Sequence, residues 1–212
     1  MTPGGDRCAD PAGGRAGDKV ALRAELLAAR RALGASARAA AAAALTRSAL
    51  ELPELVSARC VAAYVSFGTE PSTTGVLGSL LSGGVRVLLP VVRPDHDLDW
   101  AIYDDSGLVK RDRAGLWTPG SARLGVEAIK QAEAVVVPAL AVGRDGTRLG
   151  RGGGAYDRAL ARVPAGTPVI ALLYDGELRG EVPAEAHDRP VTLAVQPSGV
   201  HRFAPPDHIG SP

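Results

Sequence analysis

The sequence predicts a three-layer α/β domain in which helices cover both faces of a mainly parallel sheet, as in Rossmann-like folds. Three observations lead to this class. Short segments that are apolar throughout recur along the 212 residues, and segments with helical periodicity separate them. Strands of this kind are typical of a parallel sheet buried between helices. In addition, 46% of the residues are hydrophobic, which is enough for a sizeable core.

Two helices are expected first. Residues 18–33 have Asp18 as a suitable N-cap and Gly34 as a stop. The apolar side chains of this segment recur along one helical side: Val20, Leu22, Leu26, Leu27 and Leu33. An alanine-rich second helix is predicted over residues 36–52, closed by Pro53.

Strands and helices then alternate along the rest of the chain. Strands are predicted at residues 59–67, 85–92, 98–105, 134–140, 168–174 and 191–195. Of these, residues 98–105 alternate apolar and polar side chains, which predicts a half-exposed strand. Helices are predicted at residues 72–84, 126–132 and 152–163, the last led by glycines.

Composition, net charge and cysteine content indicate how the chain is divided into domains and which classes of partner to expect. Residues 1–17 are rich in Gly, Pro and Asp, so we expect a disordered leader, a single domain over residues 18–204 and a flexible C-terminal tail over 205–212. The formal net charge of +1 argues against nucleic-acid and membrane partners. With only Cys8 and Cys60 available, a disulfide framework is not expected. The lack of a disulfide framework fits a reducing cytoplasm. We also expect a monomer, although no feature of the sequence determines the oligomeric state.

In such sheets, ligands bind beyond the carboxyl ends of the strands, so the loops that follow the strands are candidate site segments. The loop after residues 134–140 contains three consecutive glycines, Gly152, Gly153 and Gly154. Glycine loses more backbone freedom on folding than any other residue, so such a run is costly. A domain tolerates it where the backbone must come very close to a ligand.

The surroundings of these glycines are typical of a phosphate site. Arg148 and Arg151 supply positive charge, while glycine N–H groups and a following helix N-terminus attract anions. The loop lacks the Gly-Lys-Ser/Thr of the Walker A motif, and it is too long for the dinucleotide fingerprint. A flexible surface turn with solvated arginines is the alternative. Asp157 then either caps the helix or holds Mg²⁺ beside phosphates.

The segment "PALAVGRDGTRLGRGGGAYDRAL" resembles the signature of the 5-formyltetrahydrofolate cyclo-ligase family, also called methenyltetrahydrofolate synthetases. The resemblance extends over most of the chain. It includes "KVALRAELLAARRAL" near the N-terminus, "YVSFGTEPST", "GVRVLLPVV" and "VPAEAHDRPVTLAV". The family is ATP-dependent and converts 5-formyltetrahydrofolate to 5,10-methenyltetrahydrofolate with release of ADP and phosphate. The resemblance therefore implies ATP and Mg²⁺ as cofactors and a reduced folate as substrate.

The resemblance also implies the site residues. Lys19 and Arg151 match catalytic groups, and Asp157 and Asp188 match magnesium ligands. ATP would bind Lys19, Arg23, Arg148, Leu149, Gly150, Arg151, Gly152, Gly153, Gly154, Ala155 and Tyr156. The folate would bind Val65, Glu70, Arg151, Gly154 and Ala155, with Glu70 on the pterin ring.

Each of these residues has a plainer interpretation. Lys19 and Arg23 lie four apart on a helix, a spacing that is usual for a solvated basic face. Glu70 could be hydrated or could cap the next helix, and Asp188 could stabilise a turn before Pro190.

The sequence departs from the family pattern at four positions, and two other functions stay open. Ala114 and Ala155 stand where aromatic residues are usual, Thr118 where glutamate is usual, and Gln196 where threonine is usual. A homologue that binds nucleotide and folate but has lost turnover is therefore one alternative. A phosphosugar-type isomerase on a similar scaffold is another, because the fold alone does not decide function.

Overall fold

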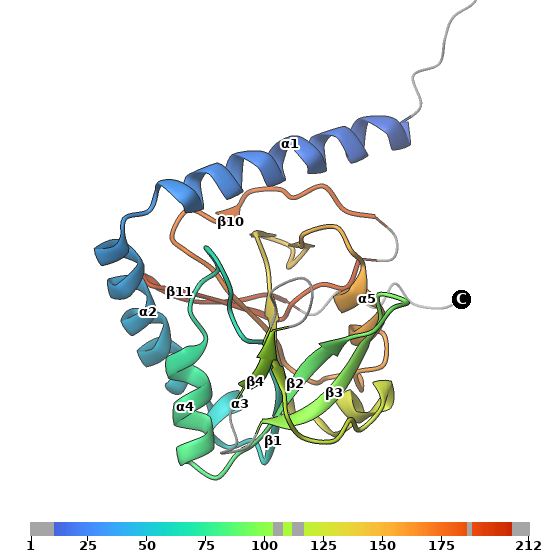
Figure 1. The fold of residues 1–212 in the computed structure, drawn as a ribbon. Helices are drawn as coiled ribbons and strands as arrows, with labels where there is room; N and C mark the ends of the chain where they lie inside the picture. Colours follow the sequence, from blue (N-terminus) through green and yellow to red (C-terminus); the bar gives the residue numbers. More distant parts are fainter. Residues whose placement is uncertain (1–10, 104–107, 112–116, 186–187, 205–212) are drawn as a thin grey trace, which may run out of the picture.

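The computed structural model describes residues 11–103, 108–111, 117–185 and 188–204 (Figure 1). Its central sheet has seven strands in the order β12-β11-β9-β6-β1-β2-β3. Their bounds are β1 Cys60–Ala62, β2 Arg86–Val92, β3 Leu98–Tyr103, β6 Ala134–Pro138, β9 Val169–Leu172, β11 Leu193–Gln196 and β12 Gly199–Arg202. The five inner strands run parallel, and β3 and β12 pair antiparallel at the two edges. The predicted mainly parallel sheet is confirmed.

Helices cover both faces of this sheet, which makes the three layers. On one face lie α2 (Ala35–Leu50), α3 (Pro53–Val56) and α4 (Thr74–Ser82) (Figure 1). The other face is covered by the 3₁₀ helix η1 (Val126–Gln131) and by α5 (Ala155–Leu160). Neighbouring residues of one strand enter opposite cores: Val136 packs with the first group and Val135 with the second. This alternation explains why the strands are apolar throughout.

A second, three-stranded sheet carries the glycine loop. It has the order β10-β7-β8 and consists of β7 (Ala141–Gly143), β8 (Arg148–Leu149) and β10 (Leu178–Arg179). The chain turns tightly between β7 and β8, where the Gly146 N–H donates to the Gly143 carbonyl at 3.0 Å. Helix α1 (Pro11–Ala32) lies across this sheet, where Leu26 packs on Leu140 and Leu149 (Figure 1).

Helix α1 differs from its prediction at its start and on its buried side. It begins at Pro11 rather than at Asp18, so residues 11–17 are helical and are not disordered leader. Proline suits the first position of a helix because it has no N–H to leave unpaired. Val20, predicted on the apolar side, is 63% exposed, whereas Lys19 and Arg30 are buried beside Leu26. Residues 1–10 and the predicted tail 205–212 lie outside the described residues.

Other elements are shorter than predicted or were missed. The chain leaves the sheet after Ala62, so residues 63–67 do not continue β1. The predicted helix 36–52 ends at Leu50, and Pro53 opens α3 instead of only closing α2. Strand β3 is buried on both sides over Leu98–Ala101 rather than half-exposed. The sequence did not indicate β12 or the hairpin of β4 (Leu108–Arg111) and β5 (Trp117–Pro119). Among the described helices, none could span a lipid bilayer.

Candidate active site

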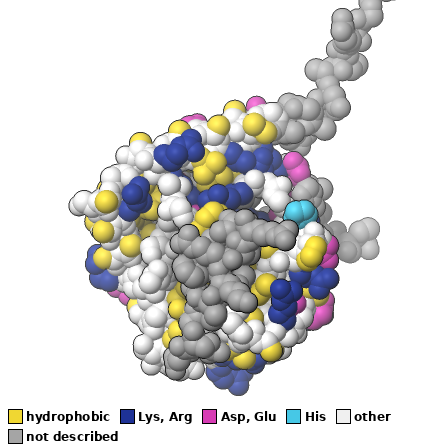
Figure 2. Space-filling view, viewed as in Figure 1, with side chains coloured by type: hydrophobic (Ala, Val, Ile, Leu, Met, Phe, Trp, Pro, Cys, Tyr) yellow, Lys and Arg dark blue, Asp and Glu magenta, His cyan; other side chains and the backbone are white. Residues whose placement is uncertain are grey.

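A cavity of about 600 Å³ lies beyond the carboxyl ends of β1, β2 and β6, where the parallel sheet predicts a ligand site. Helix α1 and the glycine loop form its other walls, and Figure 2 shows Lys and Arg side chains clustered along and beneath α1. All of the site residues predicted from the sequence line this one cavity: Lys19, Arg23, Val65, Glu70, Arg148, Leu149, Gly150, Arg151, Gly152, Gly153, Gly154, Ala155, Tyr156, Asp157 and Asp188. The fold thus brings together segments that lie up to 169 residues apart.

The backbone of the glycine loop needs glycine at specific positions. Gly152 and Gly154 have φ angles of 98° and 65°, which side-chain-bearing residues rarely adopt. Gly153 has an ordinary φ, and a Cβ built there meets no described atom within 4 Å. Helix α5 begins only at Ala155 and has six residues, so the predicted helix over 152–163 is too long. An anion at this loop would therefore be attracted mainly by the loop N–H groups and less by a helix dipole.

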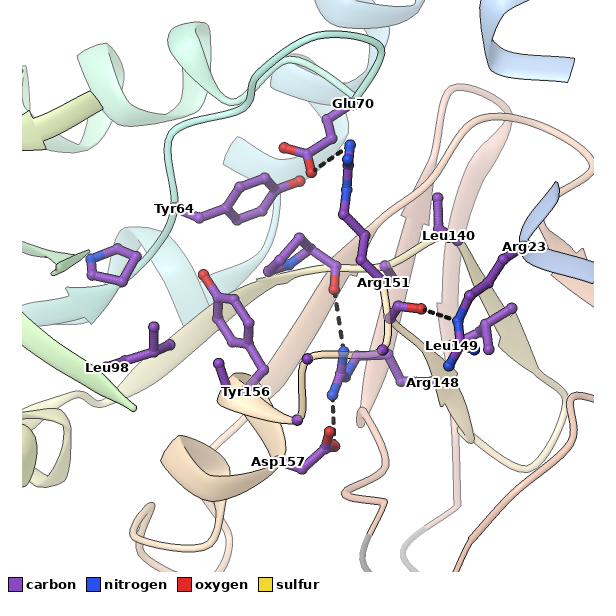
Figure 3. Close-up of a pocket in the computed structure, with 18 of the residues that line it drawn as sticks. Arg23, Tyr64, Glu70, Leu98, Leu140, Arg148, Leu149, Arg151, Tyr156 and Asp157 are labelled. Atoms are coloured by element: carbon purple, nitrogen blue, oxygen red, sulfur yellow. Dashed lines mark hydrogen bonds and ion pairs between the residues drawn. The ribbon is translucent and has the colours of Figure 1, made fainter. Parts of the chain in front are cut away.

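Arg148 and Asp157 form an ion pair in the wall of the cavity (Figure 3). The Arg148 Nη2 donates to Asp157 Oδ1 at 2.6 Å, and the Arg148 side chain is only 4% exposed. Its Nε finds no hydrogen-bond partner within the described part of the chain. Arg148 is therefore a buried cation with one counter-charge and a spare donor, which excludes the interpretation of a solvated arginine in a surface turn.

Two basic side chains of helix α1, Lys19 and Arg23, line the cavity near the glycine loop. Lys19 Nζ lies 2.8 Å from Asp188 Oδ2 and 3.2 Å from Glu185 Oε1, and the residue is 5% exposed. Arg23 Nε donates to the Gly150 carbonyl at 3.0 Å, which ties the helix to the glycine loop. The solvated-face interpretation is therefore wrong for Lys19.

Glu70 marks the opposite end of the cavity. Its Oε1 lies 3.2 Å from Arg151 Nη2, and its Oε2 accepts the Phe67 N–H at 3.1 Å (Figure 3). It makes no cap on α4, whose N-cap residue is Thr73. Burial raises the pKa of Glu70 above its usual range, and the Phe67 N–H and Arg151 offset this only in part. Arg151 also stacks over the Phe67 ring at 4.5 Å. One arginine of the glycine loop thus contacts the carboxylate at the other end.

Three buried polar residues of this region were not predicted. Arg30 donates from Nε and Nη2 to Glu177 at 2.7 and 2.8 Å, and from Nη2 to the Ala139 carbonyl at 2.6 Å. Tyr64 lines the cavity next to Glu70. The spacing of Lys19, Arg23, Leu26 and Arg30 places them on one side of a helix, which was the available signal for Arg30. Glu177 gave no signal, because its partner Arg30 comes from a distant segment. Tyr64 gave none, because it lies within an apolar run that predicts only a strand.

The carboxylates of Asp157 and Asp188 are ligands of the kind that Mg²⁺ takes in proteins, and the segments that carry them are in contact. The Arg189 N–H donates to Asp157 Oδ1 at 3.3 Å, so the segment that carries Asp188 lies against Asp157. Mg²⁺ at nucleotide sites takes one or two carboxylates and completes its shell with phosphate oxygens and water. Among the described residues, no group of three or more His, Cys, Asp or Glu is arranged to hold a metal.

The four departures from the family pattern have different surroundings. Ala155 lines the cavity at the first position of α5. The Gln196 Nε2 donates to the Tyr174 carbonyl at 3.0 Å. Ala114 lies outside the described residues, and the Thr118 backbone belongs to β5. Of the departures whose side chains the structure describes, Ala155 lines the cavity and Gln196 does not.

The chain is similar to known proteins over most of its length. The model of the 5-formyltetrahydrofolate cyclo-ligase family matches residues 15–197. The 5-formyltetrahydrofolate cyclo-ligase of Mycolicibacterium smegmatis is 42% identical over 184 residues, which cover 84% of this chain and 93% of that protein. The enzyme of the same name from Haemophilus influenzae is 31% identical over 173 residues, covering 80% and 92%.

Solved structures share the fold. The 5,10-methenyltetrahydrofolate synthetase of Aquifex aeolicus matches with a TM-score of 0.77 at 24% identity, covering 91% of this chain and 96% of that one. The synthetase of Mycoplasma pneumoniae matches with a TM-score of 0.67 at 21% identity, covering 84% and 98%. At these identities the likeness shows the α/β fold.

Proposed function

Because the chain belongs to the 5-formyltetrahydrofolate cyclo-ligase family, we propose that it converts 5-formyltetrahydrofolate to 5,10-methenyltetrahydrofolate, using ATP and Mg²⁺ and releasing ADP and phosphate. One observation carries the proposal. Arg151 belongs to the glycine loop, yet its guanidinium pairs with Glu70 at the far end of the same cavity. A phosphate end and a carboxylate end therefore share one space, as a reaction between ATP and a folate requires.

The glycine-loop end supplies what a triphosphate needs. The glycine-loop backbone, Arg148 and Lys19 line it. Backbone N–H groups bind anions, and charge-assisted hydrogen bonds to phosphate are stronger than neutral ones. Both cations already hold carboxylates, Asp157 and Asp188. Each cation therefore has a counter-charge before a phosphate binds. When a cation binds a phosphate instead, its carboxylate would be neutralised by Mg²⁺.

Phosphoryl transfer requires the protein mainly to position the reactants and to neutralise charge. The N5-formyl oxygen is a poor leaving group. Transfer of the γ-phosphoryl group forms an O–P bond to that oxygen and breaks the bond to the β-phosphate oxygen, so ADP leaves and an iminium phosphate remains. The N10 amine then bonds to the formyl carbon and loses its proton, and the C–O bond breaks as phosphate departs. No protein nucleophile is required.

Each residue has a proposed part in this reaction. Lys19, Arg23 and Arg148 would hold the phosphates, and Arg151 would lie between the γ-phosphate and the formyl group. Asp157 and Asp188 would hold Mg²⁺, which when bound neutralises phosphate charge. Glu70 would orient the pterin ring, next to Val65, Gly154 and Ala155. We also propose that the protein acts as a cytoplasmic monomer without nucleic-acid or membrane partners.

The direct test is the absorbance of 5,10-methenyltetrahydrofolate formed from 5-formyltetrahydrofolate, with and without ATP. The proposal expects product only with ATP and Mg²⁺. Ala155 in the cavity wall keeps one alternative open, a homologue that binds both ligands without turnover. That alternative predicts binding of ATP and folate with no product and no folate-stimulated ATP hydrolysis.

Gly153→Val is expected to weaken ATP binding about tenfold or more without harming the fold, a change of about 1.4 kcal/mol or more. The free protein has room for the new side chain, whereas a phosphate close to the loop backbone would collide with it. The measurement is the Kd for ATP beside the Tm. Gly78→Val on α4 is the matched control, since a Cβ at Gly78 also meets no described atom within 4 Å. Equal Kd values for Gly153→Val and the wild type would show that ATP does not approach this loop.

Folate binding is expected to weaken as the pH falls through the pKa of Glu70, because only the ionised carboxylate accepts two hydrogen bonds from the pterin N–H groups. Since burial raises this pKa, the decline should begin above the ordinary glutamate value of about 4.3. The measurement is the folate Kd from pH 5 to 8. Glu70→Gln should bind more weakly at neutral pH and lose this part of the pH dependence. Identical pH profiles for the two proteins would remove Glu70 from the folate site.

A further inference from the structure

The Tyr64 hydroxyl is a buried donor that the fold leaves without a partner. Tyr64 follows β1, is 4% exposed and lines the cavity. Its hydroxyl oxygen finds no hydrogen-bond partner among the described residues. Buried tyrosine hydroxyls usually find one, because an unpaired buried polar group costs free energy. An unpaired hydroxyl that faces a cavity therefore indicates a partner on the ligand.

The surroundings of this hydroxyl are specific. In Figure 3, the Tyr64 ring lies between Glu70 and Tyr156, and its hydroxyl is directed toward the Glu70 carboxylate. Burial, and then the nearby Glu70 and Tyr156, raise the pKa of Tyr64 well above its usual value, so the group stays an O–H donor. The nearby Tyr174 hydroxyl is already used, since it donates to the Glu70 carbonyl at 3.3 Å. Tyr64 thus offers a free hydroxyl beside Glu70.

The chemistry of a reduced pterin matches this pair of groups. Its pyrimidine ring presents two adjacent donors, N3–H and the 2-amino group, and a carboxylate accepts from both. The next polar atom on either side of these donors is an acceptor, O4 beside N3–H and N1 beside the amino group. Whichever way the ring lies, a group next to the bound carboxylate must therefore donate. A hydroxyl can do so, whereas a second carboxylate would repel the acceptor.

We propose that the Tyr64 hydroxyl donates a hydrogen bond to the pterin acceptor that adjoins the edge bound by Glu70, and that Tyr64 is thereby a specificity-determining residue for the 2-amino-4-oxo ring. The inference rests on the proposed function. Together, the Glu70 carboxylate and the Tyr64 hydroxyl are complementary to the donor, donor, acceptor order along this edge of the ring. A ring without that order leaves the hydroxyl or its own polar atoms unpaired in a buried place.

Tyr64→Phe tests the proposal, because it removes only the hydroxyl. The Kd for 5-formyltetrahydrofolate should rise roughly tenfold, as expected when a buried acceptor loses its donor. The same factor should appear for 5-formyl-6-methyltetrahydropterin, which has the ring without the benzoylglutamate tail. The Kd for ATP should stay within about twofold. The Tm should be unchanged or higher, because the free protein loses no hydrogen bond.

Tyr174→Phe is the matched control, since its hydroxyl has a partner in the protein and its removal should lower the Tm. A folate Kd for Tyr64→Phe equal to that of the wild type would overturn the proposed role of Tyr64 but not the proposed function. So would a loss of Tm as large as that of Tyr174→Phe, which would mean that the hydroxyl has a structural partner such as a buried water. If the wild-type protein itself binds no 5-formyltetrahydrofolate, the proposed function fails together with this inference.

Discussion

Replacing Asp157 with Asn is expected to lower turnover roughly a hundredfold or more, the scale on which one lost electrostatic stabiliser acts in phosphoryl transfer. Asparagine keeps an oxygen at Oδ1 for the Arg148 and Arg189 donors, but it removes the charge that attracts Mg²⁺. The Mg²⁺ concentration for half-maximal turnover should rise. Because the buried Arg148 loses its counter-charge, a stability loss of about 1–3 kcal/mol should accompany this, which leaves a typical protein folded.

Asp97→Asn provides the matched control for this loss of an ion pair. Asp97 pairs with Arg162 at 2.6 Å, the same distance as in the Arg148–Asp157 pair, but it does not line the cavity. Its replacement should leave turnover and the Mg²⁺ requirement unchanged. If Asp157→Asn lost stability yet kept near-normal turnover at low Mg²⁺, Asp157 would be a structural partner of Arg148 and not a metal ligand.

Replacing Arg30 with Met is expected to cost about 3–5 kcal/mol of stability, because it leaves the Glu177 carboxylate buried without its counter-charge. For a chain of this size the Tm should fall on the order of 10 °C. Although burial alone lowers the pKa of Arg30, Glu177 more than offsets it, so the guanidinium stays charged. The Ala139 carbonyl would also lose its donor, at the floor of the cavity. Thermal unfolding of the purified variant measures the effect.

Two further variants separate charge from packing at this pair. Arg31→Met changes the exposed neighbour on α1 and should alter the Tm by little. Arg30→Met combined with Glu177→Gln removes both charges and should recover a large part of the loss. A double variant as unstable as Arg30→Met would show that the Arg30 side chain acts by packing or through Ala139, and not through the ion pair.

The fold class and the glycine loop could be predicted from the sequence because both depend on local patterns. Apolar runs such as that of β6 indicate a buried parallel strand without any tertiary information. The glycines between Arg151 and Tyr156 likewise indicate a close backbone approach on their own. The family resemblance then added Glu70 and Asp188, whose segments reach the cavity only through the fold.

The buried Arg30–Glu177 pair, the shortest strands and the start of α5 depend on tertiary contacts or loop geometry that no local pattern contains. The helical spacing places Arg30 on the side of Leu26, but its burial depends on Glu177, which is 147 residues away in the sequence. The two-residue strands β8 and β10 exist only because β7 lies between them. Helix α5 starts late because the glycines before Ala155 adopt loop angles in place of helical ones.

In the proposed reaction, the cavity brings ATP and the formyl group of the folate together for phosphoryl transfer. The most direct measurement is the fate of the formyl oxygen, followed with 5-formyltetrahydrofolate labelled with ¹⁸O at that atom. We predict one ¹⁸O in each phosphate released, and one phosphate for each 5,10-methenyltetrahydrofolate formed. Label that appears in water instead of phosphate, or product that forms without ATP, would contradict the account.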